Sequence, residues 1–347
     1  MEMHELLQKD PEIWDLFTRK EEYHSSLRDK YNRFPYYASR YRTIFEPKAS
    51  EFLIKKGFHV EYPDNKPFAV CLTHDIDGVY KSIPAKSFRA TEKFTQGKLN
   101  EAIHLLKQIR SKKEPYVNFE KIMKLEDRYH ARSSFYFLAL DPADQDYEYR
   151  IEDFEHEIHT ILDWGWEVGL HCGHEGYKNL EKLKKEKRDL ERVTKTTVFG
   201  CRNHYLNFMV PDSWEIMSKA GFSYDTSLGY ADCVGFRNGM CHPFRPYNLN
   251  TGKIIEIIEI PLVVMEHSFA DDYMRMNPDR AWEITRQLID TVGACNGVIT
   301  FVWHNTSFFG ELAEFYEKIL NYCAKKDAWM TSGENIATWW KDNVQTL

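Results

Sequence analysis

Two acidic side chains one residue apart, Asp75 and Asp77, stand directly after an apolar run at residues 68–72. In an extended chain alternate side chains point to the same side, so both carboxylates can serve one site. One carboxylate can then act as a general base while the other binds a metal ion. A turn of solvated aspartates before Gly78 would give the same pattern, so the pair needs support from other residues.

Histidine and arginine side chains follow further apolar runs in the same way. In barrels of alternating strands and helices, active sites form on the loops at the carboxyl ends of the strands. Side chains able to do chemistry recur at such positions here, which predicts that they meet in one site. The side chains in question, besides the two aspartates, are His171, His174, Arg202 and His304.

A metal ion would explain why these side chains gather. A mononuclear hydrolytic site needs about three protein ligands and an open position for water. Asp77 and His171 would supply two ligands, and either His174 or Glu175 would supply the third. The sequence therefore predicts a site for a divalent ion.

A second histidine pair with the same spacing shows how little the spacing means by itself. His156 and His159 lie in a charged helical run, and we expect them on a solvated helix face. His171 differs because it ends an apolar run and small residues follow it. That difference favours His171 as a metal ligand.

Three residues are expected to act on the substrate or on each other. Asp75 is the candidate base, and Arg202 opposite it would hold it ionised and oriented, unless Arg202 is a surface residue. His304 has aromatic and aliphatic neighbours, from which we expect a lowered pKa and a role as general acid or base. A hydrogen-bonded core histidine is the alternative for His304.

Apolar runs alternate with charged helical stretches from residue 68 to the end of the chain, which predicts an α/β architecture with a parallel sheet or barrel. We expect a basic, polar insertion at 81–118. The expected strands are 68–73, 134–139, 167–170, 198–201, 254–260 and 298–303, and the expected helices are 151–164, 177–194, 278–292 and 311–324.

The first 66 residues are expected to form an N-terminal helical extension, followed by a barrel domain at 67–347. Asp10 is a good N-cap, and Pro11 suits the first helical position. Helical spacing of apolar residues follows, so we expect helix from Asp10 to about Gly57. The stretch 61–67 has the composition of a linker.

Composition excludes several classes of protein. The chain of 347 residues has a formal net charge of -7, which argues against a dedicated nucleic-acid binder. Its seven cysteines show no C-x-x-C spacing, so we expect buried thiols rather than a disulfide framework or a cysteine zinc site. No signal peptide is recognisable, and no apolar run approaches the roughly 18 residues of a membrane helix. We therefore expect a cytoplasmic protein without a membrane span.

From about Phe68 to its end the chain resembles the polysaccharide deacetylases, carbohydrate esterase family 4, whose catalytic module is the NodB homology domain. The resemblance implies a distorted (β/α) barrel of about seven strands, with zinc as the bound ion. The motifs stand in family order. They are Thr73-His74-Asp75-Ile76-Asp77, Ser133-Ser134-Phe135-Tyr136-Phe137, His171, Arg202, Asp225-Thr226-Ser227-Leu228-Gly229-Tyr230 and Val302-Trp303-His304.

The chain departs from the family pattern at two places. The family usually spaces its paired histidines H-x-x-x-H, but position 175 is glutamate, which leaves the third ligand open between His174 and Glu175. The family's arginine motif usually continues with proline two residues later, whereas this chain has Arg202-Asn203-His204. His204 either enters the site or shapes the loop.

Four residues are expected to contact the substrate: Asp225, Trp303, Tyr230 and Arg237. The resemblance implies a role for Asp225, which stands in a family motif. Trp303 and Tyr230 could stack on sugar rings, with core packing as the alternative, and Arg237 could equally be structural.

The resulting hypothesis is a metal-dependent hydrolase that removes N-acetyl groups from a sugar or glycan. In it Asp75 takes the proton of water, the metal stabilises the oxyanion, and His304 protonates the leaving amine. One alternative is hydrolysis of another non-peptide C–N bond. A glycoside hydrolase with two carboxylates is a second, although Asp75 and Asp77 stand too close in sequence to straddle a scissile bond easily. A noncatalytic carbohydrate-binding or assembly protein on the same fold is a third.

Overall fold

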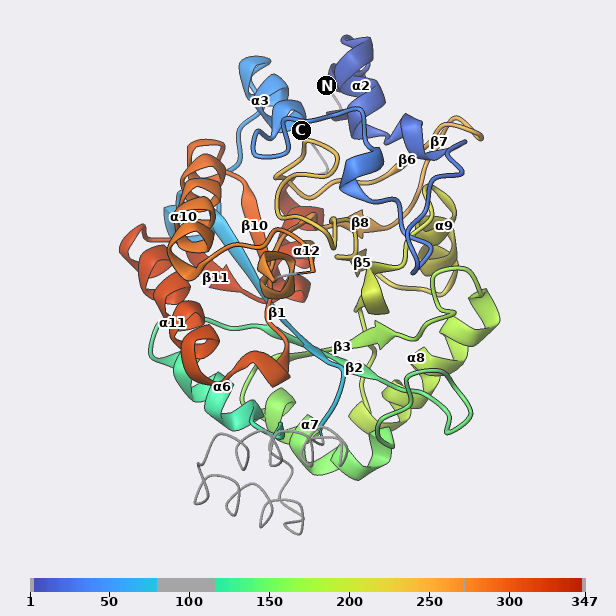
Figure 1. Cartoon of the computed structure of the whole chain (residues 1–347), viewed down its shortest axis with the longest axis vertical. Coiled ribbons are helices and arrows are strands. Elements are labelled where there is room, and N and C mark those ends of the chain that lie inside the picture. Colours follow the sequence, from blue (N-terminus) through green and yellow to red (C-terminus); the bar gives the residue numbers. More distant parts are fainter. Residues whose placement is uncertain (1–2, 80–115, 271, 345–347) are drawn as a thin grey trace, which may run out of the picture.

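The computed structural model describes residues 3–79, 116–270 and 272–344 (Figure 1). In these residues nine strands form one sheet in the order β8-β5-β4-β3-β2-β1-β10-β9, with β11 paired to β1, and every pair is parallel. The strands are β1 (Ala69–Ile76), β2 (Ser134–Leu138), β3 (Glu167–Cys172), β4 (Gly200–Asn203), β5 (Tyr224–Asp225), β8 (Ile258–Glu259), β9 (Leu262–Met265), β10 (Val298–Val302) and β11 (Trp329–Thr331). A separate hairpin consists of β6 (Tyr247–Asn248) and β7 (Lys253–Ile254).

The two edges of the sheet are joined by one short stretch of chain. β8 pairs with β5 at one edge and β9 pairs with β10 at the other, yet only Ile260 and Pro261 separate β8 from β9. The sheet must therefore curl until its edges approach each other. This confirms the expected barrel-like α/β fold.

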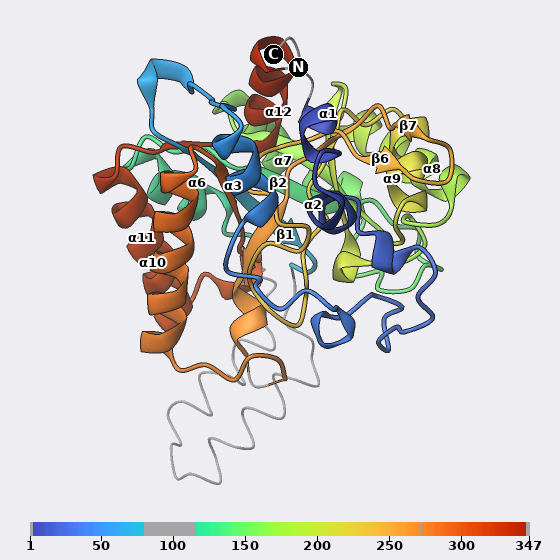
Figure 2. The same ribbon diagram turned by 90° about the horizontal axis from the view of Figure 1, so that it is seen from above.

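Helices cover the outside of the curled sheet (Figures 1 and 2). All residues of β1, β2 and β3 are buried, as expected for strands covered on both faces. The helices after residue 116 are α6 (Phe119–Asp127), α7 (Glu155–Asp163), α8 (Leu180–Thr194), α9 (Asp212–Lys219), α10 (Pro278–Ala294), α11 (Gly310–Lys325) and α12 (Gly333–Asn343).

The last helix, α12, lies at the amino ends of the strands. Its first backbone amide, at Gly333, donates to the side chain of Ser134 at the start of β2, over 2.8 Å. The next amide, at Glu334, donates to Glu167 at the start of β3, over 2.9 Å. The carboxyl ends of the strands, where barrel active sites form, are therefore at the opposite end from α12.

The N-terminal segment contains helices α1 (Met3–Leu7), α2 (Pro11–Phe17) and α3 (Lys48–Lys55). The expected cap is confirmed, since Asp10 accepts hydrogen bonds from the amides of Glu12 and Ile13. The expectation of helix through to Gly57 is wrong, because most of residues 23–47 follow an irregular path. Prolines at 35 and 47 interrupt that stretch, which breaks a continuous helix.

The N-terminal segment shares its hydrophobic core with the barrel. Leu7, Phe17, Ala49 and Leu53 belong to the same buried cluster as the strands and outer helices. Figure 2 shows α12 and both chain ends on one side of the molecule, while loops of the N-terminal segment reach the opposite side. The boundary at residue 66 remains a prediction.

Within the barrel most expected elements have counterparts in the structure, and the differences among the strands concern short ones. The run 254–260 is divided between the end of β7 and β8, and β5, β9 and β11 were not expected. Residues 80–115, most of the expected insertion, lie outside the described residues. All seven cysteines are free and buried, as expected. No helix in the described ranges is long and apolar enough to span a membrane.

Candidate metal centre

The carboxyl end of β1 brings both aspartates to one site. Asp75 lies within β1 and Asp77 just beyond its end. The Nε2 atom of His171 is 3.9 Å from an oxygen of Asp75 and 3.0 Å from an oxygen of Asp77. The two carboxylates therefore face the same imidazole, as their spacing predicts.

Three atoms able to bind a metal converge at this point, one each from Asp77, His171 and His204. Nδ1 of His204 lies 3.0 Å from Nε2 of His171 and 3.5 Å from Oδ1 of Asp77. The three residues come from the ends of β1, β3 and β4, which are spread across the sheet from β1 to β4. Two nitrogens and one carboxylate oxygen form a donor set suited to zinc with an open position.

The protonation of His171 supports this fit. Its Nδ1 lies 3.0 Å from the carbonyl oxygen of Arg202, which can only accept, so Nδ1 carries the hydrogen. The neutral ring then directs the lone pair of Nε2 toward Asp77. Burial alone would lower the pKa of His171, but Asp75 and Asp77 raise it. Asp75 and Asp77 thus favour positive charge at this position, which a divalent cation would supply.

His204 is suited to give its lone pair to a cation. Burial lowers its pKa to about 4, so the ring is neutral at neutral pH. Burial alone would raise the pKa of Asp77, but His204 and His304 lower it well below its usual range, so this carboxylate is ionised. A neutral imidazole and an ionised carboxylate are the forms that bind metals.

The structure does not bring His174 or Glu175 into this group of ligand atoms. β3 ends at Cys172, and residues 174–178 form a turn that departs from the strand direction. The ring of His174 lies against Tyr205, with 6.1 Å between ring centroids, and Glu175 forms an ion pair with Lys178 at 3.1 Å. His204, for which a place in the site was one of two interpretations, stands in this group of ligand atoms where His174 or Glu175 was expected.

Arg202 lies where it was expected, opposite Asp75. Its Nη1 atom is 3.0 Å from Oδ1 of Asp75 and donates to the hydroxyl of Thr73 over 2.6 Å. Its Nε donates to the carbonyl of Thr226 over 3.0 Å. Arg202 is fully buried, and its plane faces the ring of Tyr136 at 4.9 Å. These contacts orient the guanidinium, which in turn holds Asp75 in place.

The pKa of His304 is shifted in the direction opposite to the expected one. Burial alone would lower it, but Glu266 and Asp77 raise the pKa of His304 to about 10. Nδ1 of His304 lies 2.8 Å from Oε1 of Glu266, and Nε2 lies 3.5 Å from Oδ2 of Asp77. The expected lowering is wrong because the apolar neighbours in sequence say nothing of a carboxylate from another element.

Glu266 was not recognised from the sequence. It follows β9 directly, and it is fully buried with its pKa lowered to about 2, mainly by His304, although burial opposes this. Its position after an apolar run, 262–265, is the signal that identified the other site residues. His267 was missed as well. It is half-exposed and stacks on His304, with 4.4 Å between ring centroids.

Two of the four expected substrate contacts belong to the barrel core. Asp225 is fully buried and accepts hydrogen bonds from the amide and the hydroxyl of Ser227. Trp303 is also fully buried and stacks on Phe315, with 5.7 Å between ring centroids. Neither side chain reaches solvent, so the expectation of substrate contact is not met.

The other two, Tyr230 and Arg237, are buried against the N-terminal segment. The hydroxyl of Tyr230 accepts from Arg19 over 2.9 Å. Arg237 forms a buried ion pair with Glu22 over 2.5 Å and donates to the carbonyl of Gly229 over 2.8 Å. For Arg237 the structural alternative holds, and Tyr230 likewise packs in the interior.

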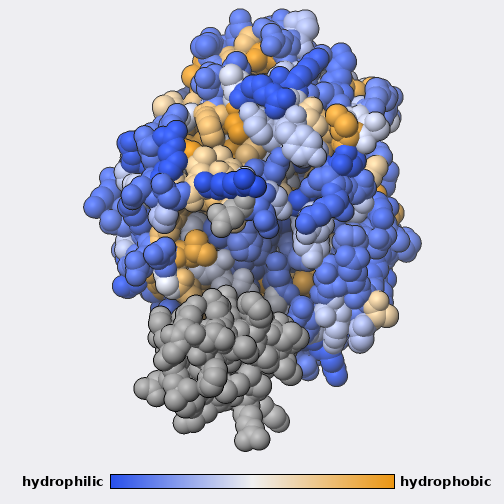
Figure 3. All heavy atoms as spheres, in the orientation of Figure 1, coloured by the Kyte–Doolittle hydropathy of each residue, from blue (hydrophilic) through white to orange (hydrophobic). Residues whose placement is uncertain are grey.

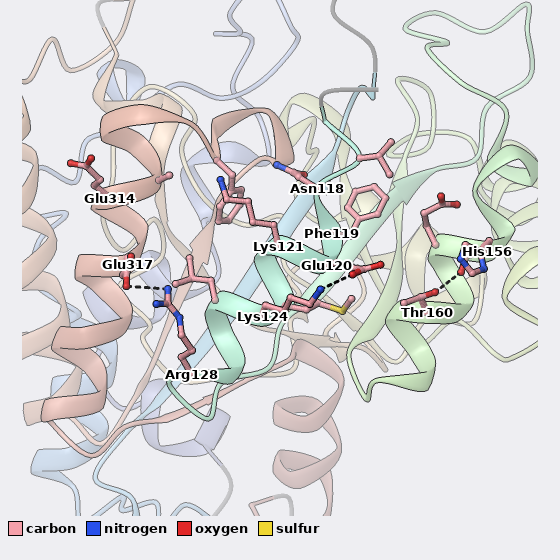
Figure 4. A pocket seen from close by; sticks show the side chains of 16 residues that line it. Asn118, Phe119, Glu120, Lys121, Lys124, Arg128, His156, Thr160, Glu314 and Glu317 are labelled. Carbon is pink, nitrogen blue, oxygen red and sulfur yellow. Dashed lines mark hydrogen bonds and ion pairs between the residues drawn. The ribbon is translucent and has the colours of Figure 1, made fainter. Parts of the chain in front are cut away.

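A cavity of about 810 Å³ lies away from the metal centre, between α6, α7 and α11 (Figure 4). Figure 4 shows Glu120, Lys124 and Thr160 around it, with His156 on α7 at one side. None of the residues that line it belongs to the group of ligand atoms. His156 is exposed on α7, as expected for a solvated helix face.

The face of the molecule seen in Figure 1 is largely hydrophilic, with hydrophobic residues in separate patches (Figure 3). At the metal centre the side chain of Asp77 is 34% exposed, whereas those of His171 and Asp75 are at most 4% exposed. The most exposed side chain of this group is therefore that of Asp77.

No protein-family model matches the sequence, and no curated protein matches it. Several solved structures are similar in fold. A protein from Mycobacterium smegmatis, provisionally named a polysaccharide deacetylase, gives a TM-score of 0.54 at 17% identity, over 82% of this chain and 93% of that chain.

Weaker matches include a CE4 family pseudoenzyme from Bacillus anthracis, with a TM-score of 0.41 at 12% identity over 80% of this chain and 66% of that chain. The peptidoglycan deacetylase PdaC from Bacillus subtilis gives 0.39 at 11% identity, over 80% of this chain and 94% of that chain. The chain thus has the fold of the Mycobacterium smegmatis protein.

Proposed function

We propose that this protein is a metal-dependent hydrolase that removes N-acetyl groups from a sugar or glycan, with zinc as its metal. The observation that carries the proposal is the meeting of Asp77, His171 and His204 beside an aspartate held by a buried arginine. The fold shared with a protein named as a polysaccharide deacetylase supports the choice of substrate class.

The residues around the metal centre would divide the reaction between them. A divalent ion, when bound, supplies Lewis-acid polarisation of the amide carbonyl and lowers the pKa of water. Asp75, oriented by Arg202, accepts a proton from the water that attacks the carbonyl carbon. Because Asp75 faces His171 at 3.9 Å, the base acts next to the metal ligands.

Breaking the C–N bond requires a proton on the leaving nitrogen. His304 is suited to give it, because Glu266 and Asp77 hold the imidazole in its charged form at neutral pH. Glu266 binds Nδ1 and leaves Nε2 to serve as the donor. One proton passes from water to Asp75 and another from His304 to the amine, so acetate and a free amino sugar result.

The test is acetate release from N-acetylated sugars and glycans by zinc-loaded protein, with the Asp75→Asn and His156→Ala variants alongside. We expect acetate from the wild type and from His156→Ala at similar rates, and release slowed by about 10²–10⁴-fold in Asp75→Asn with its zinc retained. Ammonia or another amine without acetate would point to a different C–N bond. Glycan binding without turnover in the zinc-loaded wild type would contradict the proposal.

A further inference from the structure

We propose that three residues of the N-terminal segment, Asp29, Tyr31 and Arg33, hold the turn that carries His204 and thereby complete the metal centre. We call these three residues the N-terminal clamp, and residues 204–206 the His204 turn. The inference rests on the proposed function, since it concerns the third ligand of the same metal. Residues of the N-terminal segment would then be needed for tight metal binding.

The His204 turn has a backbone that needs support. Tyr205 has φ 57° and ψ 9°, and Leu206 has φ 54°, so two successive residues with large side chains adopt the left-handed region. Residues other than glycine are disfavoured there and persist only where surrounding contacts hold them. The turn would relax if those contacts were lost, and His204 would move with it.

Arg33 binds the backbone of the turn directly. Its Nη1 donates to the carbonyl oxygen of Tyr205 over 2.8 Å, although 172 residues separate the two in sequence. Asp29 accepts from Nε of Arg33 over 2.8 Å and from the amides of Tyr31 and Arg33. Arg33 is 7% exposed, so this hydrogen bond is shielded from water.

Tyr31 holds the side chain of the turn. Its ring stacks on that of Tyr205, with 4.8 Å between centroids and 15° between planes. The guanidinium of Arg33 lies 4.7 Å from the centroid of Tyr31, and Asn32 donates to the hydroxyl of Tyr177 over 2.9 Å. The N-terminal clamp therefore contacts both the backbone and the ring of Tyr205.

Tyr205 transmits this support to the ligand. Its ring lies 4.0 Å from the ring of His204, and its hydroxyl donates to Asp146 over 3.2 Å. The other oxygen of Asp146 is 3.8 Å from Nε2 of His204, on the side away from His171 and Asp77. The imidazole is thus enclosed by Tyr205 and Asp146, with Nδ1 directed at the other two ligands.

The test is zinc affinity of the metal-free protein, measured by competition with a chromophoric chelator. Tyr31→Ala and Arg33→Ala should bind zinc about 10–100-fold more weakly, the range typical of residues that orient metal ligands. Tyr31→Phe keeps the stacked ring and should bind as the wild type does. Arg40→Ala, at an exposed arginine of the same segment, is the control and should also be unchanged.

The melting temperature of each metal-free variant separates positioning from general stability. A purely structural role would lower the melting temperature of Tyr31→Ala and leave zinc affinity unchanged, and that result would overturn the inference while the proposed function stood. Should Arg33→Ala fail to fold, the comparison of Tyr31→Ala with Tyr31→Phe decides. A wild type that binds no zinc would overturn the proposed function and this inference together.

Discussion

Asp77 lies between two histidines, His204 and His304, whose pKa values are shifted in opposite directions. On one side burial lowers the pKa of His204 to about 4, and on the other Glu266 raises that of His304 to about 10. Both rings are nearly buried. The difference lies in their carboxylate partners. Glu266 is fully buried and 2.8 Å from His304, whereas Asp146 is 26% exposed and 3.8 Å from His204.

The comparison teaches that a neighbouring carboxylate, more than burial, assigns the role of each ring. A neutral His204 can give a lone pair to a metal, while a charged His304 can give a proton to a leaving group. In the proposed function, one buried glutamate therefore separates a metal ligand from a general acid. The predictions below test this division.

The largest effect on turnover should come from replacing Asp75, the carboxylate in β1 that accepts a proton in the proposed reaction. Asp75→Asn should lower kcat by about 10²–10⁴-fold, because the amide cannot take the proton of water. Zinc content should stay at the wild-type value, since Asp75 is not among the three ligand atoms. Steady-state kinetics and elemental analysis check this, with Asp77→Asn expected to lose zinc.

His304→Gln should keep its zinc and lose about 10²-fold in kcat, the lower part of the usual range for general acid catalysis. The reason is that the variant lacks the proton donor but leaves Asp77, His171 and His204 in place. Single-turnover kinetics on zinc-loaded protein measures the chemical step. Loss of zinc in this variant would mean that both histidines are ligands, and the comparison would fail.

Glu266→Gln should change the pH dependence of kcat through its effect on the pKa of His304. Removing this charge lowers the pKa of His304, and activity that needs the protonated ring is lost as pH rises through that pKa. The basic limb of the kcat profile should therefore move to lower pH, by on the order of one unit. A limb that stays in place would show that His304 is not the group being titrated.

The smallest effect concerns stability without metal. His304 has a raised pKa in the folded state, so its stabilisation is complete below about pH 6.5 and is lost as pH rises toward 10. His204 has a lowered pKa, so its contribution is present above about pH 6.5 and is lost as pH falls toward 4. Urea unfolding with chelator present should show both losses.

Replacing each histidine in turn assigns the two losses of stability to His304 and His204. His304→Gln should flatten the loss on the basic side only, and His204→Gln the loss on the acid side only, each by up to a few kcal/mol. A change in the same pH window for both would contradict opposite pKa shifts.

Much of the fold followed from the sequence because its elements are long enough to show a pattern. The eight-residue strand β1 and the 17-residue helix α10 were both expected. The unexpected strand β5 has two residues, which is too short for any periodicity, and pairing within the barrel creates it. The prediction of helix at residues 23–47 is wrong because local spacing cannot reveal contacts with the barrel.

The site was predictable where a residue ends a strand. Asp75, His171 and Arg202 met their expected neighbours, since parallel strands align their carboxyl ends. The sequence alone does not place His204, because its position depends on a left-handed turn that propensities do not indicate. The substrate contacts failed at Tyr230 and Arg237, since their partners Arg19 and Glu22 are more than 200 residues away.

The most direct test of the metal centre is the zinc content of His204→Ala and His174→Ala, purified in parallel with the wild type and measured by elemental analysis. We predict about one zinc per chain in the wild type and in His174→Ala, and little or none in His204→Ala, as three protein ligands are needed. Zinc retained in His204→Ala and lost in His174→Ala would contradict the account.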